Sequence, residues 1–207
     1  TEETETKATD VSKVILITDS EYQVVRIDQS IPLPDYVFYP NSDTDKTAVE
    51  WTVDDLNVAE VATTTDANGK VSGTVKAKAA GVAVVKLQVV GKTEVNAAFR
   101  LIVRPTNEPK NCKADATYNS VSLSWSPVAD ANGYTITRKV EGSDTEQTIA
   151  HVDGTDTVSY KDTAAQTGIS YIYHVYAYTK YTNNGQTDYA NTDAYACLLY
   201  TSPSPRD

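Results

Sequence analysis

The sequence is short of several residue types, and these shortages narrow what the chain can be. Among its 207 residues there is no methionine, and there are only two cysteines, two histidines and two phenylalanines. Cys112 and Cys197 are too few for the disulfide framework of a small secreted domain. Without methionine, the chain is expected not to begin at a natural translation start, so the lack of a visible signal peptide carries no meaning.

Long apolar runs and positive charge are also scarce. No stretch approaches the roughly 20 apolar residues that a helix needs to span a bilayer, so we expect no membrane insertion. The sequence has 18 Lys and Arg residues and 28 Asp and Glu residues, which gives a formal net charge of −10 and a pI of about 4.6. Nucleic acid and anionic lipid both require a basic surface, so we expect neither as a partner.

Catalytic motifs are missing as well. The sequence has no G-x-S-x-G elbow, no H-E-x-x-H zinc motif and no glycine-rich phosphate loop. Neither His151 nor His174 lies near a Ser or Cys nucleophile motif, and Cys112 fits a small, half-buried apolar residue on a strand. We therefore expect no catalytic residue, no cofactor and no enzymatic activity.

What the sequence does contain is short, regularly spaced runs of strand-forming residues. Tyrosine occurs 14 times, and Val and Thr are frequent; these residues suit a pleated, half-buried surface. Turns rich in Asn, Asp and Gly separate the runs, and no convincing helix is present. The pattern predicts an all-β chain of two tandem immunoglobulin-like β-sandwiches joined by a short, proline-containing linker.

The predicted division of the chain follows its changes in composition. Residues 1–13 are rich in Thr and Glu and are interpreted as a solvated linker. One sandwich is predicted over 14–104 and the other over 110–196. Between them, 105–109 begins and ends with proline, which favours an extended connection.

Several short pieces of the first predicted sandwich occur in a characteristic order. They are Pro40, "VEWTVDDLNVAEV" at 49–61, "NGKVSGTVKAKAAGVAVVKL" at 68–87 and "FRLIV" at 99–103. This order is similar to that of the group 2 bacterial immunoglobulin-like domain found in intimin- and invasin-type surface proteins, and the resemblance covers about 14–104. Trp51 lies in an alternating strand and is expected in the core.

The second predicted sandwich carries a more extensive resemblance. The matching pieces are "SVSLSWSPVADANGYTITR" at 120–138, "IAHV" at 149–152, "YKDT" at 160–163 and "GISYIYHVYAY" at 168–178. They resemble the fibronectin type III domain of bacterial secreted proteins over about 108–196. The resemblance implies a core tryptophan, a tyrosine that opens the third strand, a tyrosine corner and two further inward residues: Trp125, Tyr134, Tyr171, Tyr173 and Val175.

Two features of the sequence are candidate binding sites. Oxygen-rich turns at Asp43 and Asp45, Asp54 and Asp55, Asp66, and Asp153 and Asp156 could hold calcium, but none matches an EF-hand loop and Asp is an ordinary turn residue. We therefore predict no metal site. The other feature is an aromatic stripe on one face of the strand near 169–181, formed by Ile172, His174, Tyr176 and Tyr178, with Tyr181 just beyond.

The stripe supports two interpretations. If exposed, it would bind a carbohydrate or a surface protein, because exposed aromatic residues stack on sugars and form binding hot spots. Alternatively, the same side chains pack against cross-strand neighbours or against the next domain.

The C-terminal segment 197–207, "CLLYTSPSPRD", follows the second sandwich with an abrupt change of composition. It resembles a translated transposase-type sequencing adaptor, read in frame over all of its residues, and is expected to be disordered. The alternative is a genuine Ser/Pro-rich linker. If the segment is foreign, Cys197 is not native and no native disulfide within the chain is available.

Together these features predict non-catalytic, monomeric spacer and interaction modules of a bacterial secreted or cell-surface protein, with a contribution to adhesion. The alternative is that they are accessory modules of a secreted carbohydrate-active enzyme whose catalytic domain lies outside this sequence. The step from fold to function rests on resemblance, since one fold serves many functions.

Overall fold

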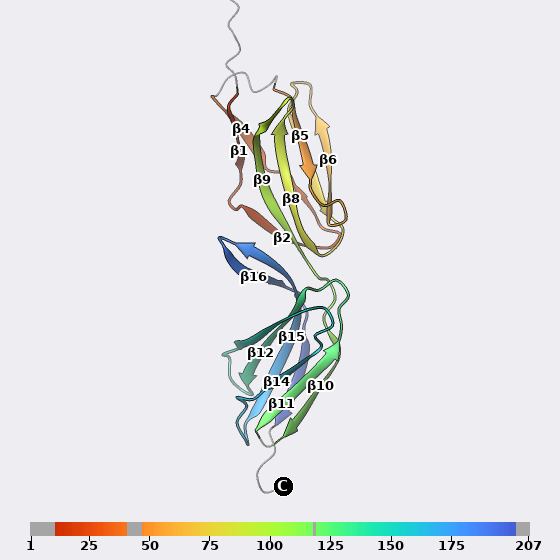
Figure 1. Ribbon diagram of the computed structural model, residues 1–207, viewed down its shortest axis with the longest axis vertical. Helices are drawn as coiled ribbons and strands as arrows, with labels where there is room; N and C mark the ends of the chain where they lie inside the picture. The colour runs from red at the N-terminus through yellow and green to blue at the C-terminus, as the bar shows by residue number, and fades with distance from the viewer. Residues whose placement is uncertain (1–10, 41–46, 118, 202–207) are drawn as a thin grey trace, which may run out of the picture. The chain divides into compact units, whose positions relative to one another are not determined.

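Figure 1 shows a computed structural model of the chain, which describes residues 11–40, 47–117 and 119–201. All regular elements in these residues are β-strands, so the predicted fold class is confirmed. The chain divides into two compact units, Thr1–Ile102 and Val103–Asp207. The boundary between the units falls within β9 (Lys92–Arg104), whose last residue is also the last residue of the first predicted sandwich.

The first unit is a sandwich of two main sheets. One sheet has the strand order β2 (Tyr22–Arg26), β9, β8 (Gly81–Val89) and β5 (Val49–Val53). The other has the order β3 (Ser30–Pro32), β7 (Val71–Ala77) and β6 (Ala59–Thr65), while β1 (Lys13–Ile17) pairs with β4 (Asp35–Tyr39). β3 ends at Pro32, and Pro34 directly precedes β4; a proline has no N–H to donate to a sheet.

The core of the first unit follows the alternation of its strands. In β8, Ala83, Val85 and Leu87 are fully buried, while the residues between them are partly exposed. Trp51 on β5 is 6% exposed, and its ring meets that of Phe99 edge to face with 6.5 Å between centroids. This T-shaped arrangement is the one that aromatic pairs prefer.

The second unit is also a sandwich of two sheets (Figure 1). The smaller sheet has the order β10 (Lys110–Thr117), β11 (Ser120–Ser126) and β14 (Ser159–Asp162). The larger has the order β13 (Gln147–Asp153), β12 (Gly133–Val140), β15 (Ser170–Asn183) and β16 (Gln186–Asn191), and β17 (Ala196–Thr201) also pairs with β15.

A cluster of buried side chains fills the space between these two sheets. The structure places five residues predicted in the core within this cluster: Trp125, Tyr134, Tyr171, Tyr173 and Val175. The Tyr134 hydroxyl accepts a hydrogen bond from Val128 N–H and donates one to the carbonyl of Thr155, each at 2.8 Å. The Tyr171 hydroxyl accepts one from Gln166 N–H at 3.2 Å, which is the phenol-to-backbone contact of a tyrosine corner.

The segment predicted to be disordered after residue 196 instead begins with a strand. β17 pairs with the first half of β15, from Val175 opposite Ala196 to Ser170 opposite Thr201. The side chains of Leu198 and Tyr200 pack against the core cluster. Leu198 and Tyr200 are two positions apart, so their side chains lie on the same face of a strand. This spacing is the signal for β17, and the change in composition of the segment does not prevent strand formation. Residues 202–207 lie outside the described residues, and the adaptor origin stays a prediction.

Candidate interaction surface

The predicted aromatic stripe lies on the larger sheet of the second unit. Tyr171, Tyr173, Val175 and Ala177 of β15 face the core cluster, so Ile172, His174, Tyr176 and Tyr178 point to the opposite side of the sheet, which we call the outer face. Tyr181 has the parity of the core-facing residues and therefore does not continue the stripe. It is 9% exposed, and its hydroxyl donates to Asp188 at 3.1 Å.

Two members of the stripe are covered by neighbouring side chains, as the second of the two interpretations expects. His174 is 6% exposed and Tyr178 is fully buried, although both point to the outer face. Ile172 and Tyr176 are half-buried. Side chains from β16, from the segment before β17 and from the turn before β13 cover the stripe.

Tyr178 is buried with the hydroxyl end of its ring close to Gly133 of β12. Gly133 pairs with Tyr178, and a Cβ added to Gly133 would lie 2.5 Å from the Tyr178 hydroxyl. The hydroxyl reaches β13, where it donates to Asp153 Oδ1 at 2.6 Å. Burial and this hydrogen bond hold the pKa of Tyr178 well above its usual value. Only glycine leaves room for this arrangement at position 133.

A second layer of rings covers Tyr178. The Tyr189 ring of β16 meets it edge to face at 4.8 Å, and His151 of β13 stacks on Tyr189 with 3.7 Å between centroids and 4° between planes. His151 Nδ1 lies 3.0 Å from Thr135 Oγ1, which donates to Asn191 Oδ1 at 2.7 Å. Because Thr135 donates to Asn191, it accepts from His151. Partial burial lowers the pKa of His151, and the nearby Asp153 offsets this only in part.

At the other end of the stripe, Glu146 and Tyr195 cover the His174 side chain. Its Nδ1 lies 2.8 Å from Glu146 Oε1, and Thr137 donates to the same carboxylate oxygen. Burial raises the pKa of Glu146, but the hydrogen bonds from Thr137 and His174 outweigh it, so the pKa is lowered overall. The Tyr195 ring lies over His174 at 4.0 Å and beside Tyr176 at 5.1 Å.

A bulge between β16 and β17 brings Tyr195 to this place. Asn191, at the end of β16, is paired with Tyr178, and Ala196, at the start of β17, is paired with Val175. Between these two pairs the chain advances five residues from β16 to β17 but only three residues along β15. The two additional residues form a bulge, which turns nearby side chains out of the regular register. Tyr195 lies in it and is 43% exposed.

The outer face thus presents a different set of residues from the predicted stripe. His151 and Tyr195 are exposed and Tyr189 is half-buried, and sequence reasoning missed all three as members of the surface. A partial signal was present, because "TDYANTDAYA" repeats tyrosine in an otherwise polar segment. The positions of these residues on the outer face depend on the bulge and on the sheet order, which local patterning does not reveal.

The oxygen-rich turns use their carboxylates within the protein. Asp54 Oδ1 accepts from Val84 N–H at 2.7 Å, and Asp55 Oδ1 accepts from Asn57 N–H at 2.9 Å. Asp66 Oδ1 accepts from two backbone N–H groups, and Asp153 pairs with Lys180 at 2.7 Å. Asp43 and Asp45 lie outside the described residues. Among the residues that are described, no group of three or more His, Cys, Asp or Glu is placed to hold a metal ion.

Both thiols are free within the described residues, Cys112 half-buried and Cys197 exposed. Burial raises the pKa of Cys112 to about 11, so little reactive thiolate forms at neutral pH. The described part of the chain also contains no apolar helix of the length that a bilayer crossing requires.

Comparisons with known proteins give structural likeness only. No protein-family model and no curated protein matches the chain. A fibronectin type III-like protein from Clostridium thermocellum is 27% identical, covering 48% of this chain and 96% of its own, with a TM-score of 0.35. The fibronectin type III domain of the human collagen alpha-1(XX) chain is 16% identical, covering 48% and 88%, with a TM-score of 0.37. A multi-domain stretch of titin is 14% identical, covering 92% and 66%, with a TM-score of 0.40.

Proposed function

We propose that the two units are non-catalytic spacer and interaction modules of a bacterial secreted or cell-surface protein, and that the second unit contributes to adhesion. The observation that carries this proposal is that each unit encloses its own core, one around Trp51 and one around Trp125. Units of this kind can be repeated in series, since neither needs the other to bury its apolar residues. The sequence resemblance to two families of bacterial surface modules supports the same role.

The outer face of the second unit is the surface that we assign to partner binding. His151 and Tyr195 offer exposed rings on it, and each is held by a neighbouring ring, Tyr189 and His174 respectively. A ring that is already fixed loses little conformational entropy when it binds a partner. Aromatic residues in such positions contribute most of the binding energy in many interfaces.

A binding screen with matched variants tests this assignment. The full chain would be displayed on beads and incubated with a glycan array and with extracellular-matrix proteins. We expect a bound partner whose signal falls in the variants His151→Ala and Tyr195→Ala. Tyr39→Ala, which removes a 64% exposed tyrosine from the first unit, is the control and is expected to leave binding unchanged. Equal loss in all three variants, or no loss in the first two, would contradict the outer face as the binding surface.

A further inference from the structure

A polar cleft of about 320 Å³ lies in the second unit, away from the rings of the outer face. Its walls come from the end of β12, the turn into β13 and the segment between β14 and β15. The size is at the small end of the roughly 300–1,000 Å³ typical of small-molecule sites.

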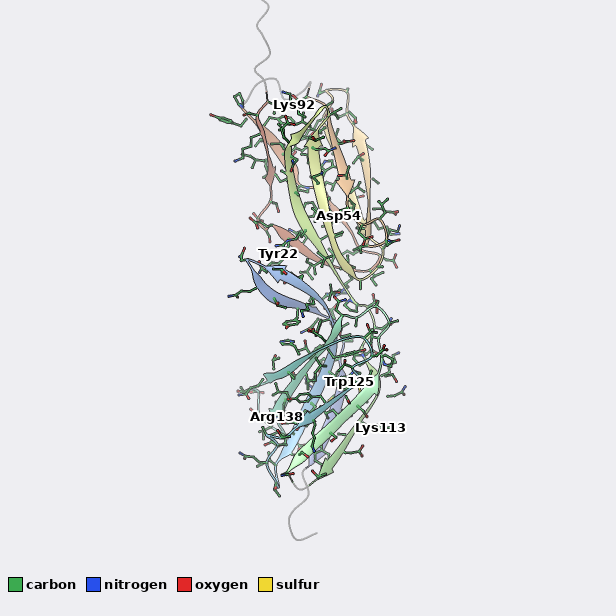
Figure 2. The ribbon with its side chains drawn as sticks, viewed as in Figure 1. Tyr22, Asp54, Lys92, Lys113, Trp125 and Arg138 are labelled. Carbon is green, nitrogen blue, oxygen red and sulfur yellow. The ribbon has the colours of Figure 1, made fainter. Side chains whose placement is uncertain are left out.

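Arg138, which is labelled in the second unit in Figure 2, lines this cleft. Its Nη1 donates to Asp162 Oδ2 at 2.7 Å, and its guanidinium carbon lies 4.9 Å from the centre of the Tyr171 ring. Tyr173 is a second hydrogen-bond partner of Arg138, and none of the Arg138 nitrogens is both buried and unpaired. The remaining N–H groups of a fixed, planar donor are therefore open to solvent in the cleft.

Other residues that line the cleft have side chains with free hydrogen-bond donors and free acceptors. The side-chain amides of Gln147 and Gln166 and the hydroxyl of Thr145 form no hydrogen bond with another described residue. Each amide offers two donors and one acceptor oxygen, and the hydroxyl offers one donor and an acceptor. Ser143 Oγ accepts from Thr145 N–H at 3.1 Å, which fixes the turn that carries Thr145.

The groups around the cleft carry no excess of positive charge. Asp162 is 2% exposed and compensates Arg138 directly. Lys139, the other cation of the lining, is followed by the carboxylates of Glu141, Asp144 and Glu146 in the turn. An anionic ligand would therefore gain little, whereas a neutral ligand with many hydroxyl groups matches the mixture of donors and acceptors.

We propose that this cleft binds one pyranose unit of a neutral glycan. The sugar hydroxyls would accept from the open N–H groups of Arg138 and exchange hydrogen bonds with the amides of Gln147 and Gln166. The inference goes beyond a spacer role and does not use the outer face. If it fails, the proposed spacer and adhesion function is unaffected.

The test uses the full chain labelled with 15N and titrated with the methyl pyranosides of glucose, galactose, mannose, xylose and N-acetylglucosamine. At least one sugar is expected to shift the backbone amide signals of Ser143, Gln147 and Gln166. Each lost hydrogen bond weakens binding about 3–10-fold, so Gln147→Leu combined with Gln166→Leu is expected to weaken it at least about tenfold. Gln186→Leu, the same change at the exposed first residue of β16, is the control.

Three results would overturn the proposal. The first is that none of the sugars shifts signals around the cleft at millimolar concentration. The second is that the double variant binds as tightly as the parent while its spectrum shows an intact fold. The third is that glucuronate or galacturonate binds more than about tenfold more tightly than the neutral sugars, which would show that charge rather than hydroxyl recognition dominates.

Discussion

The buried carboxylate of Asp162 offers the sharpest test of how the second unit is stabilised. Its Oδ2 accepts from Arg138 Nη1 at 2.7 Å and from the Tyr173 hydroxyl at 2.8 Å, and its Oδ1 accepts from Ala164 N–H at 2.9 Å. The Arg138 side chain is 17% exposed, against 3% for Asp162. The two partners of this ion pair are therefore not equivalent.

We expect Asp162→Ala to be far more damaging than Arg138→Met. Removing Asp162 takes the acceptor away from Arg138, from the buried Tyr173 hydroxyl and from Ala164 N–H, and breaking a buried ion pair in this way costs about 3–5 kcal/mol. Removing Arg138 leaves Asp162 with two donors, so the expected cost is about 1–2 kcal/mol. For a domain of this size, each kcal/mol lowers the melting temperature by about 4–8 °C.

Differential scanning calorimetry of the full chain measures both effects, because the two units have separate cores. Asp162→Ala should lower the melting transition of the second unit by about 12–40 °C and leave that of the first unit in place. Asp162→Leu combined with Arg138→Met should recover much of the loss, since no buried charge remains. Equal costs for the two single variants, or a double variant as unstable as Asp162→Ala, would refute the reasoning.

Three further outcomes are expected for the second unit. Tyr171→Phe removes the hydrogen bond from Gln166 and should cost about 1 kcal/mol in urea denaturation, with the fold intact; a cost above about 3 kcal/mol would mean that the ring itself is displaced. Iodoacetamide at pH 8 should label Cys197 quickly and Cys112 only after unfolding, because burial raises the pKa of Cys112 to about 11. The pKa of His151 is lowered in the fold, so the unfolded chain takes up its proton first as the pH falls. The melting temperature should therefore decrease below about pH 6.5, and His151→Gln should make this decrease shallower; an unchanged slope would contradict the lowered pKa of His151.

The sequence predicted the β-sandwich class because its signal is local. In β11, Val121, Leu123 and Trp125 alternate with serines, and all three are buried as a period of two requires. The core-facing side of β15 was equally visible from alternation. Such patterns show which side chains share a face, and this is enough to define a core.

The sequence could not predict how the outer face is covered, because that depends on contacts between distant segments. Tyr178 is buried only because Gly133, on a neighbouring strand, leaves room for its ring. Tyr195 reaches His174 only because two additional residues form a bulge. β17 was missed because a change in composition was given more weight than the spacing of Leu198 and Tyr200.

The attachment points of the second unit have a mechanical consequence. The carbonyl of Val103, where the unit begins, accepts from Thr179 Oγ1 at 2.7 Å, and Thr201, at the end of β17, pairs with Ser170. These two anchors lie nine residues apart on the single strand β15, about 30 Å at 3.3 Å per residue. A force that pulled on both ends would act along β15 and load the hydrogen bonds between β15 and β17 in shear, all at once. A module held in this way resists extension better than one whose terminal strand peels off one hydrogen bond at a time.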